Sequence, residues 1–359
     1  MLVNSGLGVF VNSETVQFHF NQFDDSNSFN FYTDIVEFEK NSNQLRIAAF
    51  HVPFPPDTKW LESLQRAGQV SSRIFVFCSE LHQATVEQIK LLDQPNISLY
   101  ISGIVTHQFC HARVYEWLDW FHTSSEFYVR ANSGFLDDKL MPYQTKNKMF
   151  DILLGCQRPH RDFVYQHIKN NSLEDKTVMT YVYYAHRSII NNDQFILETE
   201  NIKLDPATTY THSVNRVMYY DFPMQLSQIV PIEIYNQTAY SLVTETNACN
   251  DFNFYTEKIV KPLLARRLFV VIAGQYYLKN LRAMGFKTFN SIIDESYDNV
   301  ANDQQRWKMA MQQVDLLCQQ DQREVLDSIK DITEHNYQLI SNKNWYKEML
   351  LNLVNEIKQ

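Results

Sequence analysis

The chain of 359 residues is 45% hydrophobic and 20% charged, close to the composition of soluble proteins that bury sizeable cores. Its length predicts two domains, since single domains usually contain about 100–200 residues. Only eight glycines are present, which excludes collagen-like and glycine-linker architectures. The net charge of −9 argues against broad, sequence-independent binding to nucleic acid, because that affinity comes mostly from Lys and Arg side chains that neutralise phosphates.

The five cysteines are odd in number and include no Cys-x-x-Cys pair, which is typical of free thiols in a reducing compartment rather than of a disulfide framework. No stretch contains the ~18 apolar residues that span a bilayer, and the N-terminus lacks the basic and long apolar regions of a signal peptide. We therefore expect a cytoplasmic protein without a transmembrane segment.

In the first half of the chain, short apolar runs alternate with segments that carry apolar residues at helical spacing. The runs Leu45–Phe50, Ile74–Cys78 and Ile97–Val105 predict buried strands. Between them, Asp57–Ala67 and Gln83–Leu92 predict helices. Such alternation is typical of βαβ units around a parallel sheet.

The same alternation restarts in the second half of the chain, which indicates a second α/β lobe. A helix is predicted at Arg161–Lys169. Strands are predicted at Met149–Gly155, Thr177–Tyr183, Tyr240–Glu245 and Leu268–Ala273. The predicted fold class is therefore α/β, with two Rossmann-like lobes.

The polar segment Asp137–Lys148 contains Pro142 and no sustained periodicity, so we place the boundary between the lobes within it. The lobes then cover residues 1–145 and 146–300. In residues 301–359 the apolar spacing becomes helical, and this helical C-terminal tail is expected to pack on the lobes. A coiled-coil surface for a partner is the alternative, although the apolar stripe is not sustained over several heptads.

The segment Tyr240–Phe289 carries the pattern most typical of a ligand site. A predicted strand ends in a polar loop, and a helix begins near Thr256, a good N-cap residue. The free N–H groups and the dipole of a first helical turn favour an anion such as phosphate. Glu257 can accept from ribose hydroxyls and Lys258 can bind a diphosphate, so the three residues are equipped to hold a nucleotide. The alternative is a plain helix cap followed by a solvated lysine.

The letters TEK at this helix start are followed by KPLLA, two arginines, an apolar strand and a glycine. This segment resembles the nucleotide-binding part of the C-terminal lobe in GT-B glycosyltransferases, most closely the fucosyltransferase-like group. Uncharacterised phage and bacterial glycosyltransferases have a similar segment, which continues as here through YLKNLRAMGFKTF and IIDESYD. The resemblance implies a GT-B-like fold in which residues 146–300 bind a nucleotide-sugar and residues 1–145 form the acceptor-side lobe.

A second matching element is MFDILLGCQRPHRDFVYQHIKNN, Met149–Asn171. It is similar to the first strand, basic loop and helix of the same lobe, where such enzymes place an arginine against the donor diphosphate. The resemblance therefore implies Arg158 and Arg161 as diphosphate ligands. Arg161, at the expected start of the helix, is the preferred candidate.

Three further residues are implied as donor contacts. The fucosyltransferases carry an Asn-containing acidic motif upstream of their TEK-like element, and here TETNACNDFNFY places Glu245 and Asn247 near that position. The spacing differs, which leaves the identity of the donor open. Tyr255 either stacks on the base or packs in the core.

The resemblance implies catalysis at a cleft between the lobes, where an inverting enzyme uses Asp, Glu or His as the base for the acceptor hydroxyl. Glu80 and His82 follow the predicted strand Ile74–Cys78, and the carboxyl ends of strands line the crevice of open α/β sheets. Glu80 is the candidate base, with a plain acid at a helix start as the alternative. His186 and Arg187 follow a strand of the second lobe, and His186 is the second catalytic candidate.

No metal site is predicted. The chain contains no Asp-x-Asp motif of the kind that holds Mn²⁺ or Mg²⁺ in GT-A enzymes, so a metal-independent reaction without a further cofactor is expected. His107, Cys110 and His111 lack the companion ligands of a zinc site. Gly6–Gly8 lacks the third glycine and the preceding strand of a dinucleotide-binding motif.

The sequence therefore predicts a glycosyltransferase that moves a sugar from a nucleotide-sugar donor to an acceptor hydroxyl on a surface glycan or a similar saccharide. One alternative is a phage enzyme that modifies a hydroxymethylated DNA base, which requires a basic channel along Lys258–Lys287. Another is a non-catalytic carbohydrate-binding protein that has kept the fold without the chemistry.

Overall fold

The computed structural model describes residues 7–11, 29–33, 37, 46–51, 58–71, 73–78, 90–105, 108–131, 134–182, 191–204, 216–248 and 252–358. The chain divides into two compact units. One contains Met1–Asp119 together with the C-terminal Trp345–Gln359, and the other contains Trp120–Asn344. The division thus falls at Asp119 and not at the expected position between residues 145 and 146.

The polar segment Asp137–Lys148 lies inside the second unit. The Tyr143 hydroxyl is 2.8 Å from Thr333 Oγ1, and the backbone N–H of Lys146 donates to the side chain of Gln322. Both partners belong to the same unit. The polarity of this segment therefore reflects hydrogen bonds to neighbouring helices rather than the exposure of a linker.

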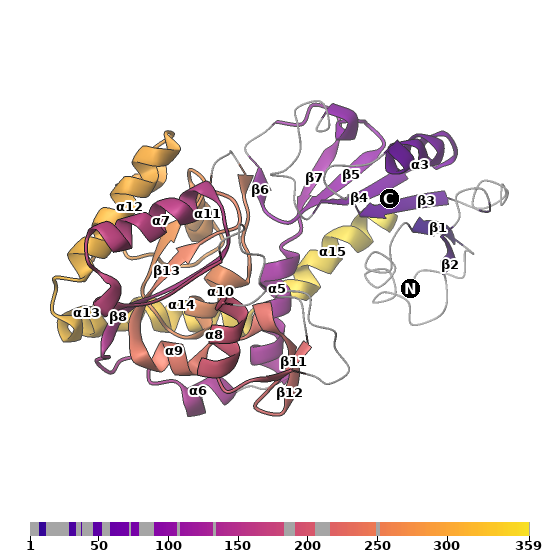
Figure 1. Ribbon diagram of the computed structural model, residues 1–359. Helices are drawn as coiled ribbons and strands as arrows, with labels where there is room; N and C mark the ends of the chain where they lie inside the picture. Colours follow the sequence, from indigo (N-terminus) through magenta and orange to yellow (C-terminus); the bar gives the residue numbers. More distant parts are fainter. Residues whose placement is uncertain are drawn as a thin grey trace. The chain divides into compact units, whose positions relative to one another are not determined.

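The first unit is built on a parallel sheet (Figure 1). The six strands of its described part lie in the order β2-β1-β3-β4-β5-β7, and every neighbouring pair is parallel. Helix α3 (Thr58–Val70) confirms the helix expected at Asp57–Ala67 and packs against β3 and β4. The strands are β1 (Leu7–Val11), β2 (Phe29–Tyr32), β3 (Arg46–His51), β4 (Arg73–Cys78), β5 (Ile97–Ile101) and β7 (Arg113–Glu116).

Two of the strands expected in this unit are confirmed as β3 and β4. The expected strand Ile97–Val105 is too long. Strand β5 ends at Ile101, whose carbonyl accepts from the backbone N–H of Gly103 at 2.7 Å in a tight turn, and β6 (Ile104–Val105) is a separate strand. Most of the expected helix Gln83–Leu92 lies outside the described residues.

The second unit is also built on a parallel sheet, and the strands of its described part lie in the order β15-β13-β8-β9. All of them are strands that the sequence predicts. From β8 the chain winds to β9 on one side, and from β13 it winds to β15 on the other, so the winding reverses between β8 and β13. The strands are β8 (Lys148–Cys156), β9 (Thr177–Val182), β13 (Thr238–Thr244) and β15 (Phe269–Ile272).

Helices cover both faces of this sheet (Figure 1). Helix α12 packs against α7 and β15, α8 contacts β9, α9 contacts β8 and β13, and α10 contacts β13 and α14. The helices are α5 (Asp119–Glu126), α6 (Phe135–Lys139), α7 (Pro159–Asn170), α8 (Asn191–Thr199), α9 (Ile232–Gln237), α10 (Glu257–Leu264), α11 (Tyr277–Ala283), α12 (Asp303–Leu317), α13 (Gln322–Ser328) and α14 (Lys330–Asn342). The antiparallel strands β10 (Lys203–Leu204), β11 (Arg216–Tyr219) and β12 (Phe222–Gln225) form a small separate sheet.

The C-terminal segment is helical, as the apolar spacing predicts. Helix α12 buries Trp307, Met311 and Val314. Helices α12, α13 and α14 belong to the second unit, whereas α15 (Trp345–Lys358) groups with the first. Within the part of the chain that the structure describes, no helix has the length and apolar character needed to cross a bilayer. Both units contain a parallel sheet with helices packed on it, so the fold is α/β.

Candidate functional site

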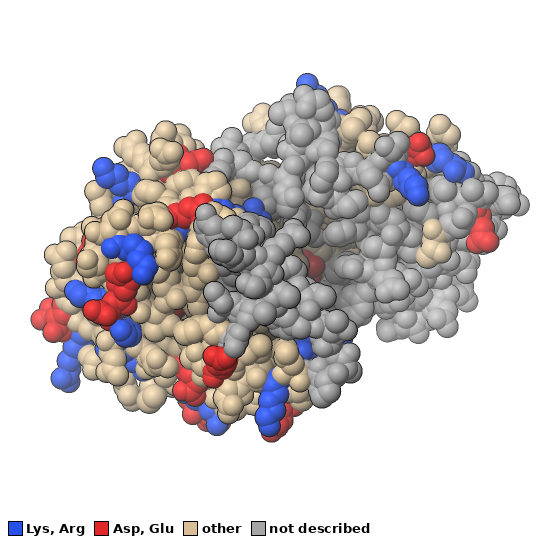
Figure 2. Space-filling view, viewed as in Figure 1, with Lys and Arg blue, Asp and Glu red and all other residues tan. Residues whose placement is uncertain are grey.

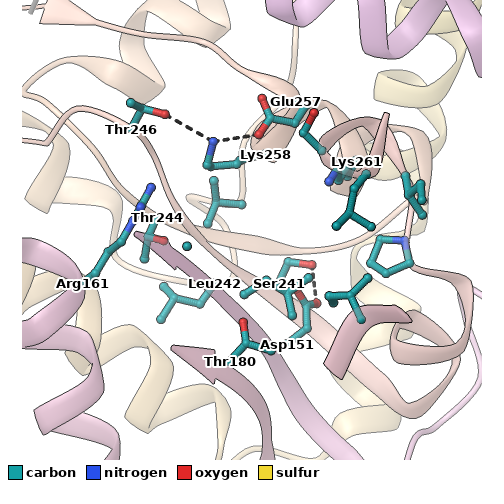
Figure 3. A pocket seen from close by; sticks show the side chains of 18 of the residues that line it. Asp151, Arg161, Thr180, Ser241, Leu242, Thr244, Thr246, Glu257, Lys258 and Lys261 are labelled. Carbon is teal, nitrogen blue, oxygen red and sulfur yellow. Dashed lines mark hydrogen bonds and ion pairs between the residues drawn. The ribbon is translucent and has the colours of Figure 1, made fainter. Parts of the chain in front are cut away.

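A cavity of about 300 Å³ lies in the second unit where the winding of the sheet reverses (Figure 3). Ligands of open α/β sheets bind at such a position, outside the carboxyl ends of the strands. Residues of β8 and β13 form the floor, and the first turns of α7 and α10 contribute charged side chains. The polar lining residues are Asp151, Cys156, Arg158, Arg161, Thr180, Ser227, Tyr235, Ser241, Thr244, Thr246, Glu257, Lys258 and Lys261.

Arg158 and Arg161 present guanidinium groups to the cavity from the start of α7. The helix begins here because Pro159 suits a first helical position. Arg161 is only 3% exposed, and its Nη1 donates to the carbonyl of Cys156 at 2.7 Å. The Nε–H groups of both arginines are buried and have no hydrogen-bond partner among the described residues. Unpaired donors on buried cations are costly, and an anionic ligand would satisfy them.

Arg161 lies directly against Gly155. A Cβ atom at position 155 would lie 3.3 Å from Arg161 Nη1, so glycine leaves the space that the guanidinium occupies. Burial, reinforced by the charge of Arg158, lowers the pKa of Arg161 to about 10. The guanidinium is therefore still protonated at neutral pH, and an anion beside it would offset the repulsion between the two arginines.

Thr256 is the N-cap of α10, as its position in the sequence predicts. Its Oγ1 accepts from the backbone N–H of Lys258 and donates to Glu245 Oε2 at 2.8 Å. Thr256 is buried and does not line the cavity. It orients the first turn of α10, whose next two side chains do face the cavity.

Glu257 and Lys258 form an ion pair at the cavity wall. Lys258 Nζ donates to Glu257 Oε1 at 2.8 Å and also lies 3.3 Å from Thr246 Oγ1 (Figure 3). Burial by itself raises the pKa of Glu257, but the charges of Lys258 and Lys261 outweigh it and hold that pKa below its usual value. Glu257 is therefore ionised at neutral pH and can accept hydrogen bonds from ligand hydroxyls.

Lys261 follows one turn later on the same face of α10 and also lines the cavity. Its ammonium group is partly buried and forms no hydrogen bond or ion pair with any residue in the described ranges. Burial, with the nearby charge of Lys258, lowers the pKa of Lys261 to about 8.

The cavity floor contains a buried ion pair. Asp151 Oδ1 accepts from Ser241 Oγ at 2.7 Å and from Arg267 Nη2 at 2.8 Å. The arginine also donates to the backbone carbonyls of Tyr235, Thr238 and Tyr240. Burial raises the pKa of Asp151, although Arg267 opposes this shift. The negative charge of Asp151 is thus compensated within the protein.

Glu245 lies beneath the first turn of α10 rather than in the cavity. It is fully buried and accepts from the Thr256 hydroxyl at 2.8 Å and from the Tyr277 hydroxyl at 2.7 Å. Burial raises the pKa of this carboxyl despite the charge of Lys258 and these hydrogen bonds. The geometry assigns Glu245 a positioning role, in which it holds the N-cap of α10.

Asn247 and Tyr255 are likewise buried and do not line the cavity. Asn247 Nδ2 donates to the carbonyl of Phe252 at 2.6 Å. The Tyr255 ring stacks on the Tyr277 ring with centroids 4.3 Å apart, and its hydroxyl donates to the Tyr277 carbonyl. Of the two roles that the sequence leaves open for Tyr255, the structure shows packing in the core.

Both catalytic candidates, Glu80 and His186, lie outside the described residues, as do His82, Arg187 and His107. The structure therefore describes the expected donor residues but neither candidate base.

The remaining histidine and cysteine candidates have other surroundings. Cys110 and His111 are exposed, and their backbone N–H groups donate to the carboxylate of Asp93. Among the residues that the structure describes, no three His, Cys, Asp or Glu side chains are grouped so as to hold a metal ion.

Most residues that line this cavity are not among the predicted donor contacts, and three of them illustrate why. Lys261 could have been found from its spacing of four residues from Glu257, which puts both on one helix face. Asp151 could have been suspected as a charged residue inside an otherwise apolar strand. Thr246 gives no comparable signal, because a threonine in a polar loop is common.

The sequence matches no protein-family model and no curated protein. Among solved structures, the chain is similar to a UDP-forming α,α-trehalose-phosphate synthase from Burkholderia xenovorans, with a TM-score of 0.40 and 10% sequence identity. The likeness covers 98% of this chain and 99% of that chain. Similarity at this level establishes neither a shared family nor a shared activity. The fold and the site themselves define an α/β protein with a cavity, lined by Arg158, Arg161, Lys258 and Lys261, at the switch point of its second sheet.

Proposed function

We propose that this protein is a glycosyltransferase of GT-B-like architecture whose second unit binds a nucleotide-sugar donor in the cavity between β8, β13, α7 and α10. The observation that carries the proposal is the pair of buried Nε–H donors of Arg158 and Arg161, which find no partner among the described residues. They line the same cavity as Glu257 and Lys258 at the start of α10. An anion of low molecular weight, such as a diphosphate, has the charge and size to complete this site.

The donor would lie with its diphosphate against Arg158, Arg161 and Lys258. Bidentate guanidinium groups suit phosphate oxygens, and the first turn of α10 adds the positive end of its dipole. Glu257, which is ionised, would accept from the ribose hydroxyls. Four of the residues that the sequence predicts for a donor, Arg158, Arg161, Glu257 and Lys258, line this cavity, and Glu245 with Thr256 supports the first turn of α10.

In the proposed reaction, the oxygen of an acceptor hydroxyl forms a bond to the anomeric carbon of the donor sugar. The bond between that carbon and the diphosphate breaks, and the hydroxyl proton passes to a base, for which Glu80 is our candidate and His186 the second. Arg158, Arg161 and Lys258 would stabilise the negative charge on the leaving diphosphate without a metal ion.

A saccharide acceptor is favoured over DNA because four of the seven basic residues between Lys258 and Lys287 form ion pairs within the protein. Arg266 pairs with Asp137 and Glu334, and Arg282 pairs with Glu295. Lys, Arg, Asp and Glu side chains are interspersed on the described surface of the second unit that Figure 2 shows. A DNA channel needs cations that are free to neutralise successive phosphates.

The proposal is tested by thermal unfolding of the full chain with UDP, GDP and CMP, and with their sugar conjugates. A ligand at about 100 times its dissociation constant adds about 2.7 kcal/mol to the free energy of unfolding. We expect one nucleotide class to raise the melting temperature, and Arg161→Gln to weaken this nucleotide at least about tenfold. Arg323→Gln, at an exposed site on α13, serves as the control and should bind as the wild type does.

Two outcomes would change the conclusion. If no nucleotide stabilises the chain, the cavity does not bind a nucleotide donor and the proposal is wrong. If a nucleotide-sugar binds at the Arg161 site but its sugar is never released or transferred over long incubation with saccharide acceptors, the non-catalytic carbohydrate-binding alternative is correct.

A further inference from the structure

Besides Arg158 and Arg161, Lys261 is a cation of the cavity that forms no ion pair with a described residue, although the charge of Glu257 lies near it. Lys258 is paired with Glu257 at 2.8 Å, and Asp151 is paired with Arg267 at 2.8 Å. No residue in the described part of the chain pairs with the Lys261 ammonium group, although it lines the cavity and is partly buried. A cation in this environment has lost part of its hydration without gaining a partner, which is unfavourable until a ligand supplies one.

The position of Lys261 differs from that of the arginines. In Figure 3, Arg161 and Lys261 lie on opposite sides of the cavity, with the Lys258–Glu257 pair between them. Asp151 and Ser241 lie below on the floor. The cavity therefore has two cationic positions, which we call the outer position (Arg158, Arg161 and Lys258) and the inner position (Lys261).

A neutral sugar would satisfy the inner position only in part. Its hydroxyl groups can accept hydrogen bonds from an ammonium group, but they do not compensate its charge. Asp151 is the nearest acidic group of the floor that Figure 3 labels, and its carboxylate is already bound by Ser241 and Arg267. Burial lowers the pKa of Lys261 to about 8, and the nearby charges of Glu257 and Asp151 oppose this shift only in part. A carboxylate on the ligand would supply further negative charge.

We infer that the donor sugar is acidic, of the hexuronate class, and that Lys261 binds its carboxylate while the donor diphosphate occupies the outer position. This inference rests on the proposed function, because it assumes that the outer position holds a nucleoside diphosphate. The carboxylate would accept charge-assisted hydrogen bonds from Lys261 Nζ, since the Ser241 hydroxyl on the floor already donates to Asp151.

The test compares nucleotide-sugars that differ only in the oxidation state of the sugar C6 atom: UDP-glucose with UDP-glucuronate, and GDP-mannose with GDP-mannuronate. Calorimetric titration of the full chain gives the dissociation constant of each. We expect the hexuronate of one pair to bind at least about tenfold more tightly than its hexose, the range of a hydrogen bond between charged groups. Lys261→Met should remove this preference and leave binding of the hexose conjugate within about threefold of wild type.

Two control variants locate the effect. Lys308→Met changes an exposed lysine of α12 outside the cavity and should keep the preference for the hexuronate. Lys258→Met, at the outer position, should weaken hexose and hexuronate conjugates by the same factor. The unliganded Lys261→Met variant should unfold at the wild-type temperature or higher, because it loses a charge that has no partner. This readout separates ligand binding from a structural role of Lys261.

Each contrary result has a distinct meaning. Equal binding of hexose and hexuronate by the wild-type chain overturns the inference and leaves the proposed function standing. If Lys261→Met weakens the hexose and the hexuronate conjugates equally, the inference is likewise overturned and the proposed function stands, because Lys261 would then bind the diphosphate. If neither UDP nor GDP binds, nor any of their conjugates, the proposed function fails together with the inference.

Discussion

Arg161 owes its position to the residue that it lies against. A Cβ atom at position 155 would be 3.3 Å from Arg161 Nη1, so a side chain there would make the guanidinium shift by a few tenths of an ångström. The bond to the Cys156 carbonyl holds Nη1, while Nε has no partner among the described residues. In the proposed site, the glycine at the end of β8 thus helps to position a group that would bind the donor diphosphate.

Gly155→Ala should therefore weaken nucleotide binding more than it weakens the fold. The added methyl group displaces the end of a flexible side chain, so we expect the free energy of unfolding to change by less than about 1 kcal/mol. The affinity for the nucleotide should fall several-fold, because Arg161 no longer holds its position. Chemical unfolding and calorimetric titration of the same samples check both parts.

Gly68→Ala in α3 is the matched control. A Cβ atom at position 68 would be 3.6 Å from Ile74 Cδ1, an ordinary contact, and alanine is a better helix former by about 1 kcal/mol. This variant should gain stability and keep its affinity. A Gly155→Ala variant that binds as tightly as the wild type would show that the position of Arg161 is unimportant.

Lys261 makes the stability of the unliganded chain depend on pH. Its pKa falls from 10.5 to about 8 on folding, so between these values the unfolded chain binds more protons than the folded chain. The free energy of unfolding therefore increases as the pH rises from about 8 to about 10.5. Above that range Lys261 is neutral in both states, and the destabilising effect of burying its charge is gone. The other titratable groups that line this cavity belong to Asp151, Cys156, Arg158, Arg161, Tyr235, Glu257 and Lys258.

The measurement is urea unfolding from pH 7 to pH 10.5 for the wild type and for Lys261→Met. The difference between the two isolates Lys261 from other groups that titrate in this range, such as Lys146, whose pKa burial lowers to about 8. The wild type should gain stability relative to the variant as the pH rises. Parallel curves would mean that Lys261 is not desolvated in the unliganded chain.

At the scale of secondary-structure elements, the start of α10 connects the core to the cavity. Glu245 at the end of β13 accepts from the Thr256 side chain, and Thr256 in turn caps the helix. The next two side chains, Glu257 and Lys258, are thereby directed into the cavity. The orientation of the wall therefore depends on a hydrogen bond between two residues that do not line the cavity.

Thr256→Ala should destabilise the chain by about 1–2 kcal/mol through the lost cap. It also removes a donor to the buried Glu245 carboxylate, which adds to the cost. Thr256→Ser keeps the hydroxyl and should recover most of both stability and nucleotide affinity. Urea unfolding of the two variants provides the comparison, and equal losses in both would contradict the capping role.

At the scale of the whole second unit, Arg267 joins elements that are far apart in the chain. It binds Asp151 of β8, Ser241 and the Tyr240 carbonyl of β13, and the Tyr235 carbonyl of α9. Its guanidinium carbon also lies 4.2 Å from the centroid of the Tyr235 ring. The cavity floor is therefore part of the structural core as well as part of the site.

Removing either member of this pair should leave a buried charge without compensation. We expect Arg267→Met and Asp151→Asn each to cost about 3–5 kcal/mol, and the double variant to cost less than the sum of the two. A double-mutant cycle in urea measures the coupling. The exposed pair of Lys330 and Asp327 is the reference, for which each change should stay within about 0.5 kcal/mol. Additive effects at Asp151 and Arg267 would rule out direct coupling.

Short-range signals account for the parts of this protein that the sequence predicts well. The strands of the second sheet follow from apolar runs, and α10 begins where Thr256 offers a cap. Glu257 and Lys258 follow the expected N-cap, and the resemblance implies Arg158 and Arg161 in a segment that begins a helix; all four line one cavity. These features depend on residues within a few positions of one another, which periodicity and capping rules capture.

Other features needed the tertiary structure. The segment around Pro142 reads as a linker, yet it bonds to the helices α13 and α14, and the division of the chain falls at Asp119. Glu245 reads as a donor ligand, yet it is buried under the N-cap of α10. Polar residues look alike in a sequence whether they face solvent, a ligand or a buried partner.

The sequence by itself determined the α/β class, the strands of the second sheet and the charged helix starts, because each follows from local spacing. Only the tertiary structure decided which of these charges remain unpaired. Asp151 and Arg267 are separated by 116 positions and neutralise one another, whereas Arg158, Arg161 and Lys261 reach the same cavity without a counter-ion among the described residues. The choice between a paired and an unpaired charge depends on long-range packing, and the unpaired cations of this cavity are the physical basis of the proposed donor site.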